Sequence, residues 1–415
     1  MRRKIILVLL TALIFGASQI GLTQSKYLYE TGEIDSLYSN ILEEQRVIWV
    51  QLPEKFNPES VQKYPVIYVL DGSIHLKAVS TVMNYYWGGF IPEMIIVGVS
   101  NANNRTRDLT TSEIKTRHGY KFTEENGQAN NFTLFLEKEL IPYVTSNYPV
   151  TNYRTLIGHS FGGLFTMNTL LNHTNLFDNY LVIDPSMDWD NQKLLKQSEE
   201  LLKNKNFEGK SLFLSLGGQL HMQNNNITIN NVMEDTSEYT LFTRSNIEFK
   251  SLVEKNIQND LNFQWKFYES DLHGTVSLPS IMDGLIFLFD WYPIERTDKF
   301  NSPDTPTEEL VQLIRNREKK LKDHFDYFVP PFDEELLSML GYMNLEWGET
   351  EKSLSFFQLC AEYFPTSANT YDSLADFYES QEDYVNALKY VQKAFAISGD
   401  SQHKERIDKF ENLVK

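Results

Sequence analysis

A serine between glycines, Ser160 in the run Gly158-His159-Ser160-Phe161-Gly162-Gly163, is the residue with the clearest chemical potential. This pattern is typical of a nucleophile elbow, in which the serine occupies a tight turn between a strand and a helix. Small neighbours are needed because the backbone at the serine is strained and adjacent strands come close. An apolar run over 155–157 precedes the motif and a helix-forming run over 164–171 follows it. This context predicts that Ser160 is a nucleophile.

A general base must accompany the serine, because a hydroxyl is a poor nucleophile at neutral pH. Where a nucleophile elbow occurs, the chain order is serine, acid, histidine, so the base should follow the last strand. His273 fits this place, since it follows an apolar run over 263–268 and precedes a glycine. His221 falls too early in the strand order, and His75 is expected at the surface or rim.

The negative charge that develops on an attacked carbonyl oxygen needs two backbone amides aimed at it. One should be the amide of Phe161, directly after the nucleophile. The other should come from the turn after an earlier central strand, and the run 66–70 followed by Asp71-Gly72-Ser73 supplies such a turn. Ser73 is preferred to Gly72 as the donor by its place in the turn.

Short apolar runs alternate with longer helical stretches from about residue 46 to residue 291. Most of these runs lack a two-residue alternation, which indicates strands covered on both faces in a mostly parallel sheet. The order predicts a layered α/β domain, with an α/β-hydrolase fold, over residues 25–295. The expected strands lie at 47–50, 66–70, 95–99, 155–157, 180–183, 212–216 and 265–268.

The C-terminal part differs from the rest and repeats internally. A linker and helix are expected over 296–330, with Thr305 as a hydroxyl cap before Pro306. In 331–415, an offset of 34 residues aligns Gly341 with Ala375 and Cys360 with Ala394. A 34-residue period with small residues at these places is typical of tetratricopeptide repeats, so we expect a small all-α domain able to bind a protein partner.

The chain is acidic, with a formal net charge of −18 over 415 residues. Nucleic acid is therefore a poor candidate for a partner, because it is bound through clustered Lys and Arg. The single cysteine, Cys360, cannot form an intrachain disulfide. No Cys and His cluster has zinc-site spacing, so we expect neither metal nor cofactor.

The N-terminus has the layout of a secretory signal peptide over 1–24. Arg2, Arg3 and Lys4 precede an apolar run over 5–15, and small residues follow. The apolar run is too short for an ordinary transmembrane helix. We expect cleavage, a mature protein without a membrane span, and a periplasmic or extracellular location.

These motifs together resemble the putative esterase family, which includes siderophore (enterochelin) esterases, S-formylglutathione hydrolase and the antigen 85 mycolyltransferases. The resemblance covers about residues 48–288. It is carried by the runs 64–72, 105–110, 184–186 with Trp189, the serine motif, and 273–276. It implies ester hydrolysis with Ser160 as nucleophile and His273 as base.

The acid of the triad departs from the family pattern. The family usually places it in or after the loop that follows the strand at 212–216, where this chain has Gly217-Gly218-Gln219-Leu220-His221. The next carboxylates are Glu234 and Asp235, and we favour Asp235 with Glu234 second. Asp184 lies at another strand end and could replace them, although its neighbours are expected to line the pocket. Some siderophore esterases work with a Ser/His dyad, so an acid need not be present.

The resemblance also places Arg107 and Asp108 beside the mouth of the site. Arg107 could hold an anionic group of the substrate in a fork of hydrogen bonds, or pair with Asp108 to pin the loop. Trp189 is expected to contact the substrate as well.

Three functions remain open from the sequence. The leading one is a serine carboxylic ester hydrolase acting on a small-molecule ester, possibly one like a siderophore. The second is an acyltransferase on the same fold. The third is a catalytically weak scaffold that binds a partner through its repeat tail.

Overall fold

The computed structural model describes residues 32–54, 56, 62–117 and 119–415. The predicted signal peptide, 1–24, lies outside the described residues.

An eight-stranded sheet organises the first part of the described chain, in the spatial order β1-β2-β4-β3-β7-β8-β9-β10. The strands β1 and β2 form an antiparallel pair, β2 is antiparallel to β4, and every later pairing is parallel. A separate hairpin, β5 and β6, projects from it. The bounds are β1 Glu33–Ser39, β2 Glu44–Gln51, β3 Tyr64–Leu70, β4 Ile95–Val99, β5 Thr116–Arg117, β6 Tyr120–Lys121, β7 Val150–His159, β8 Asn179–Ile183, β9 Ser211–Gly217 and β10 Asn262–Tyr268.

Helices cover both faces of this sheet. The helices α2 and α9 pack on one face, and α4, η1, α5, α6, α7 and α8 supply apolar side chains to the other. Their bounds, with those of the short α3 and the 3₁₀ turns, are α2 Gly72–Tyr86, α3 Arg105–Leu109, α4 Ala129–Phe135, η1 Leu136–Leu140, α5 Ile141–Asn147, α6 Phe161–Asn172, α7 Trp189–Asn204, η2 Val232–Glu234, η3 Glu238–Thr240, α8 Leu241–Lys255, η4 Ile257–Asn259 and α9 Ser277–Leu288. This arrangement confirms the predicted α/β-hydrolase fold.

The expected central strands are present because they are apolar on both sides. Every residue of β3, β4 and β8 is buried, as a strand between two layers of helices requires. The sequence reasoning missed β1, whose burial alternates, and the exposed hairpin of β5 and β6. Both lie at the edge of the domain or outside it. Because they are not buried on two faces, they lack the continuous apolar runs that identified the central strands.

The rest of the described chain is helical, which confirms an all-α tail. Its helices are α10 Thr297–Phe300, α11 Thr307–Phe325, α12 Glu334–Glu346, α13 Thr350–Tyr363, α14 Ala368–Ser380, α15 Tyr384–Ser398 and α16 Ser401–Val414. The starts of α12 and α14, and those of α13 and α15, are each 34 residues apart. Gly341 shows why small residues recur, since a Cβ there would lie 2.5 Å from the buried Phe357 ring.

The start of α11 differs from the expected cap. Pro306 is the N-cap and its side chain accepts no amide. The hydroxyl of Thr305 instead donates to the carbonyl of Lys299, at 2.8 Å. The capping prediction was wrong because this hydroxyl is used to close the preceding turn.

The end of α11 fastens the tail to the sheet domain. The His324 ring stacks on Trp291 with 3.7 Å between ring centroids, and Phe325 meets Tyr153 edge-on at 5.3 Å. Arg317, which is buried, donates to the carbonyls of Pro331 and Tyr292 at 2.7 and 2.5 Å. Tyr153 lies near the beginning of β7, so the tail is attached at the amino end of this strand.

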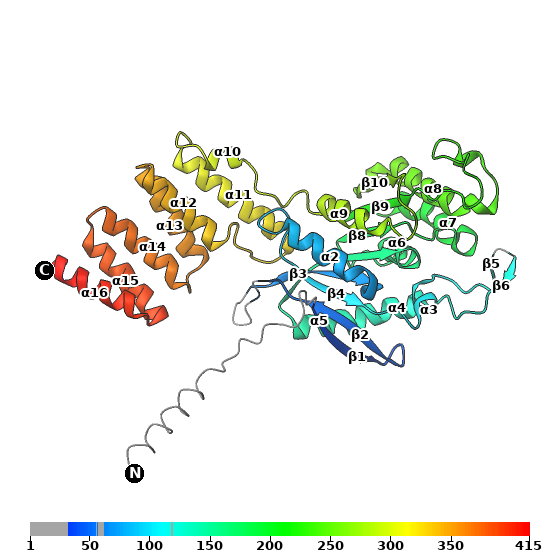
Figure 1. Ribbon diagram of the computed structural model, residues 1–415, viewed down its shortest axis with the longest axis horizontal. Coiled ribbons are helices and arrows are strands. Elements are labelled where there is room, and N and C mark those ends of the chain that lie inside the picture. The colour runs from blue at the N-terminus through cyan, green and yellow to red at the C-terminus, as the bar shows by residue number, and fades with distance from the viewer. Residues whose placement is uncertain (1–31, 55, 57–61, 118) are drawn as a thin grey trace, which may run out of the picture.

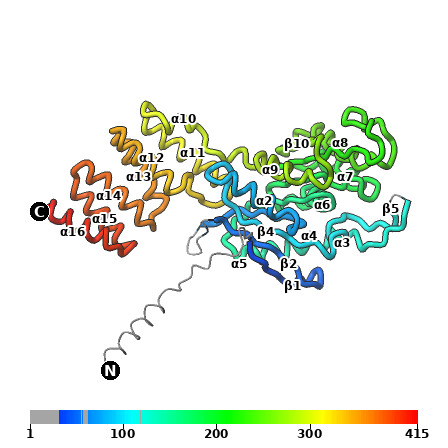
Figure 2. The backbone as a smooth tube through the Cα atoms, in the orientation of Figure 1, coloured from blue at the N-terminus to red at the C-terminus, as the bar shows by residue number. Residues whose placement is uncertain are grey.

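The tail therefore lies far from the carboxyl edge of the sheet. It extends to one side of the sheet domain and ends at the C-terminus (Figure 1). The hairpin of β5 and β6 lies at the opposite end of the molecule (Figure 2). In parallel α/β sheets, ligands bind at the carboxyl ends of the strands, so a site for chemistry and the tail are on different ends of β7.

We predict that Arg317→Met lowers the free energy of unfolding by about 2–3 kcal/mol, because two buried carbonyls lose their donor. The matched control is Arg315→Met on the same helix. Arg315 pairs with Glu318 and Glu362 but is about one-third exposed, and its loss should cost less than about 1 kcal/mol. Urea unfolding followed by circular dichroism measures both, and equal losses would contradict the prediction.

Candidate active site

Ser160 lies at the turn between β7 and α6 in a strained conformation. Its φ and ψ are 60° and −115°, a region that costs a side-chain-bearing residue about 1–3 kcal/mol. The turn is held on both sides, since the Ser160 amide donates to the carbonyl of Ile183 and its carbonyl accepts from Leu164 and Ser186. This is the geometry of a nucleophile elbow, which presents the hydroxyl at the carboxyl edge of the sheet.

The glycines of the motif are required by close packing. A Cβ on Gly158 would lie 2.2 Å from the carbonyl oxygen of Gly162, and one on Gly163 would lie 2.9 Å from Pro185. The turn therefore folds back on its own strand and against the neighbouring one. Only hydrogen fits at these two positions.

His273 is held by Asp184. Its Nδ1 lies 2.6 Å from Asp184 Oδ2, and the Asp184 side chain is 3% exposed. A carboxylate accepts, so Nδ1 carries the proton and Nε2 keeps its lone pair. That tautomer suits a histidine that is to take a proton from a serine.

Asp184, rather than Asp235 or Glu234, is the carboxylate that the fold brings to His273. Asp235 accepts from the amide of Ser237 and the hydroxyl of Thr240, at 2.7 and 3.0 Å. Glu234 is exposed at the end of η2. Asp235, which the sequence reasoning favoured, makes no hydrogen bond to His273 here, because the insertion that carries it turns onto its own side chains.

The order of the strands explains the choice of Asp184. β8 lies directly beside β7, with Ile183 opposite His159 in the register, so the residue after β8 is next to the nucleophile turn. At the end of β9, the usual position of the acid, the Gly217 amide donates to Asp184 Oδ1 at 3.1 Å. The glycine thus supports a carboxylate from the neighbouring strand.

Two further histidines form a row of ring contacts with His273. The His159 and His273 rings are 4.6 Å apart between centroids, and His75 meets His159 edge-on at 5.6 Å. Burial, with His273 and His75 nearby, lowers the pKa of His159 to about 3. His75 was expected at the surface or rim, but it is buried on the inner side of α2, and burial lowers its pKa too.

The predicted oxyanion amides stand at two helix starts. Phe161 is the first residue of α6, and Ser73 is the second residue of α2. Neither amide, nor the Ser160 hydroxyl, makes a hydrogen bond to another residue in the described part of the chain. A Cβ on Gly162 would lie 3.6 Å from Asp71 Oδ2, which shows that the two helix starts adjoin.

Arg107 belongs to a structural network instead of the site. Its guanidinium donates two hydrogen bonds to the Glu44 carboxylate, at 2.7 and 3.2 Å, and one to Asp108, at 2.9 Å. Arg46 completes the network through Glu44 and Asp108. Since the Arg107 side chain is only 12% exposed and each of its nitrogens has a carboxylate partner, the expectation that it binds substrate is replaced by the ion-pair role.

Arg105, two positions before Arg107 on α3, is the arginine of this loop that reaches the nucleophile turn. It pairs with Asp71 at 2.9 Å and donates to the His159 carbonyl at 3.1 Å. Its guanidinium carbon lies 5.4 Å from the centre of the Phe161 ring. Sequence reasoning missed it because two arginines that are two positions apart on a helix point to different sides, and the sequence does not reveal which of them faces the site.

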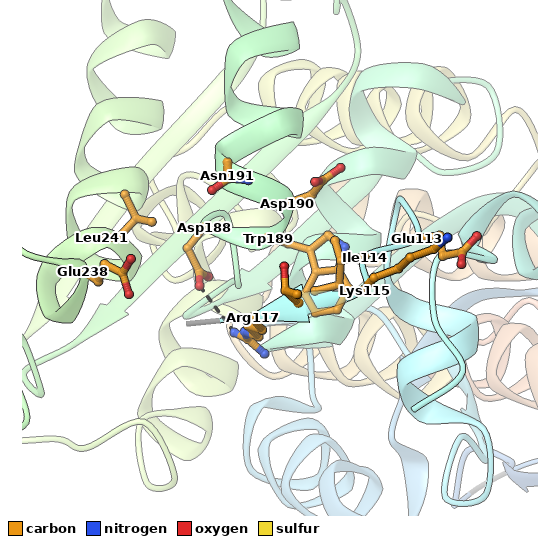
Figure 3. Close-up of a pocket in the computed structure, with 11 residues that line it drawn as sticks. Glu113, Ile114, Lys115, Arg117, Asp188, Trp189, Asp190, Asn191, Glu238 and Leu241 are labelled. Atoms are coloured by element: carbon orange, nitrogen blue, oxygen red, sulfur yellow. Dashed lines mark hydrogen bonds and ion pairs between the residues drawn. The ribbon is translucent and has the colours of Figure 1, made fainter. Parts of the chain in front are cut away.

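A pocket of about 290 Å³ lies between the segment that leads into β5 and the starts of α7 and α8 (Figure 3). Trp189 lines it, is itself 2% exposed, and packs against Phe161 with 5.2 Å between ring centroids. Arg117 covers both rings and pairs with Asp188 at 3.3 Å. The wall is completed by residues from the loop before β5 and from the starts of α7 and α8: Glu113, Ile114, Lys115, Thr116, Asp190, Asn191, Glu238 and Leu241.

His159, Asp184 and His273 also offer ligand atoms within 4.8 Å of one another. These atoms are already used between the residues, since Asp184 accepts from His273 and His159 Nε2 lies 2.9 Å from the His273 carbonyl. A metal ion at this place would have to displace the His273–Asp184 hydrogen bond.

The sheet order and the helices on both of its faces define the α/β-hydrolase fold, with Ser160 in a strained turn after β7 and His273 bonded to the buried Asp184. A model of the family described as putative esterase matches residues 39–238, a stretch that contains Ser160 and Asp184 and ends before His273. The ferri-bacillibactin esterase BesA of Bacillus subtilis is 28% identical over 191 residues, which are 42% of this chain and 66% of that protein, just under two thirds of its length.

Solved structures extend the likeness. An IroE-like serine hydrolase of Shewanella oneidensis is 27% identical and has a TM-score of 0.63 over 80% of this chain and 99% of its own. An uncharacterised protein of Capnocytophaga ochracea, 18% identical, has a TM-score of 0.58 over 92% of this chain and all of its own, and shows the fold alone. Together the comparisons support an esterase, that is, a carboxylic ester hydrolase.

Among the helices of residues that the structure describes, none is both long enough and apolar enough to cross a bilayer.

We predict that Gly158→Ala lowers the free energy of unfolding by at least about 1–3 kcal/mol, because the added methyl group overlaps the Gly162 carbonyl. The control is Gly274→Ala, where a Cβ would meet nothing within 4 Å. That change should be neutral or stabilise by up to about 1 kcal/mol. Thermal unfolding of the two variants measures the difference, and a Gly158 variant as stable as the parent would refute the packing argument.

Proposed function

We propose that this protein is a serine carboxylic ester hydrolase that acts through an acyl-enzyme on Ser160. The observation that carries the proposal is the 2.6 Å contact between His273 Nδ1 and Asp184 Oδ2 at the edge of the sheet where Ser160 lies. On this proposal Asp184 is the acid of the triad, in place of Asp235. The contact also leaves His273 in the tautomer that a general base needs.

The reaction proceeds in two steps on the side chains of this chain. Ser160 Oγ attacks the acyl carbonyl while His273 Nε2 takes its proton, and the imidazolium formed is stabilised by Asp184. The tetrahedral oxyanion accepts from the amides of Phe161 and Ser73. His273 then protonates the leaving alcohol, whose departure leaves the acyl group on Ser160. A water molecule, deprotonated by His273, attacks this acyl group, and His273 returns the proton to Ser160 Oγ as the acid leaves.

The substrate occupies the pocket beside Phe161, with Trp189 and Arg117 in its wall. Supporting this assignment, the pocket adjoins the residue directly after the nucleophile through the Phe161–Trp189 contact. We infer a small-molecule ester, and the similarity to a ferri-bacillibactin esterase makes siderophore-type esters the first class to assay.

The tail forms a tetratricopeptide-like pair of repeats that binds a protein partner. Supporting this, the helix starts repeat at 34 residues. Its attachment at the amino end of β7 leaves the carboxyl edge of the sheet free for substrate. The N-terminal sequence favours export, so the enzyme would act in the periplasm or outside the cell.

Labelling by a fluorophosphonate probe tests the nucleophile. The wild type should be labelled, and Ser160→Ala should lose the label completely, because no other serine would be paired with an activated histidine. Ser186→Ala, a neighbouring serine, is the matched control and should still be labelled. No labelling of the wild type, or undiminished labelling of the Ser160 variant, would sink the proposal.

Two isosteric variants separate the candidate acids. Asp184→Asn should lower kcat for p-nitrophenyl acetate roughly 100- to 10,000-fold, because the amide cannot hold the required His273 tautomer. Asp235→Asn should change kcat by no more than about twofold, as for a substitution at a partly exposed position. Steady-state kinetics decide between them, and a reversed order would assign the acid to the insertion after β9.

A further inference from the structure

The loop that carries His273 has to cross the ends of two strands to reach the nucleophile. It follows β10, whereas Ser160 follows β7, and β8 and β9 lie between them in the sheet. A loop that spans this distance needs fixed points along its length, since a misplacement of about 1 Å at a catalytic group can cost two orders of magnitude in rate.

One fixed point on the loop is Asp271, whose carbonyl accepts from the Gly218 amide at 2.6 Å. A second is the His273 ring, held by Asp184. Neither fixes the backbone of His273 against β7, the strand that leads to the nucleophile.

His159 makes that connection. It is the last residue of β7 and directly precedes Ser160. Its Nε2 lies 2.9 Å from the carbonyl oxygen of His273. A carbonyl can only accept, so Nε2 carries a proton and donates it. The two rings also pack together, tilted by 38° with 4.6 Å between centroids.

The surroundings keep His159 uncharged. Burial, and after it the nearby His273, His75 and Arg105, lowers the pKa of His159 to about 3. It remains a neutral donor over the pH range in which a histidine base works. Being neutral, it also adds no repulsion when His273 becomes an imidazolium during the reaction.

We propose that His159 is a positioning residue, whose Nε2–H···O bond to the His273 backbone holds the base in place over Ser160. The proposal rests on the function proposed above, because it assigns His159 a role through His273. Since His159 directly precedes Ser160 in the chain, this hydrogen bond joins the backbone of the base to the residue next to the nucleophile.

The test compares two replacements of His159. Glutamine has a side-chain amide that reaches about as far as Nε2 and can donate to the same carbonyl, whereas leucine fills similar space without a donor. With p-nitrophenyl acetate, His159→Leu should lower kcat roughly 10- to 100-fold while KM changes little. His159→Gln should recover most of the lost kcat.

The control is His173→Leu, the same replacement at the far end of α6. The His173 ring makes no hydrogen bond to a described residue, so this variant should keep the kcat of the wild type. Active sites are counted by fluorophosphonate labelling to completion, and kcat is expressed per labelled site, so that loss of folded protein does not enter the comparison.

Two outcomes would overturn the proposal while leaving the esterase intact. One is a His159→Leu enzyme with the kcat of the wild type per labelled site. The other is a glutamine variant as impaired as the leucine variant, which would make packing, and not the hydrogen bond, the contribution of His159. A wild type that is neither labelled nor active would instead overturn the proposed function itself.

Discussion

The hydrogen bond between His273 and Asp184 is the interaction on which the candidate site depends. It forms between residues 89 positions apart and exists only because parallel strands end at one edge of the sheet. Asp184 is buried and also accepts from the Gly217 amide, so its carboxylate is held by a contact that does not involve the histidine. A charge-assisted bond of this kind fixes both the orientation and the tautomer of the imidazole.

The backbone is strained at the carboxyl edge of the sheet. Ser160 at φ 60° and Asp184 at φ 43° are non-glycine residues with positive φ at the ends of adjacent strands. Such conformations persist where the surrounding structure over-determines them, and here the glycines of the serine motif allow that packing. Both residues leave their strands abruptly at this edge, and Asp71, which follows β3, has a positive φ as well.

The rest of the structure leaves this edge accessible. The buried network of Arg46, Glu44, Asp108 and Arg107 fixes the loop that carries Arg105 beside Phe161. The helical tail is fastened at the other end of β7 by Trp291, His324 and Phe325. Under the proposed function, a partner bound to the tail would therefore not cover the pocket.

The sequence by itself determined the parts of the protein that follow from local chemistry. Apolar runs buried on both faces identified the central strands, and the glycine spacing around Ser160 identified the turn, because only such a spacing permits it. The chain order placed His273 after the last strand. The 34-residue period of the tail was recognised from recurring small residues such as Gly341. A small residue is required there because the Phe357 ring packs against it.

Only the tertiary structure decided which distant side chains meet. Asp184 replaced Asp235 as the partner of His273 because β8 is the neighbour of β7, a fact of strand order that no local pattern carries. Arg107 proved to be structural while Arg105 faces the nucleophile turn, because residues two positions apart on a helix point to opposite sides. The burial of His75 and the attachment of the tail likewise follow from contacts between segments far apart in the chain. These contacts depend on how the layers pack and not on the neighbouring residues in the sequence.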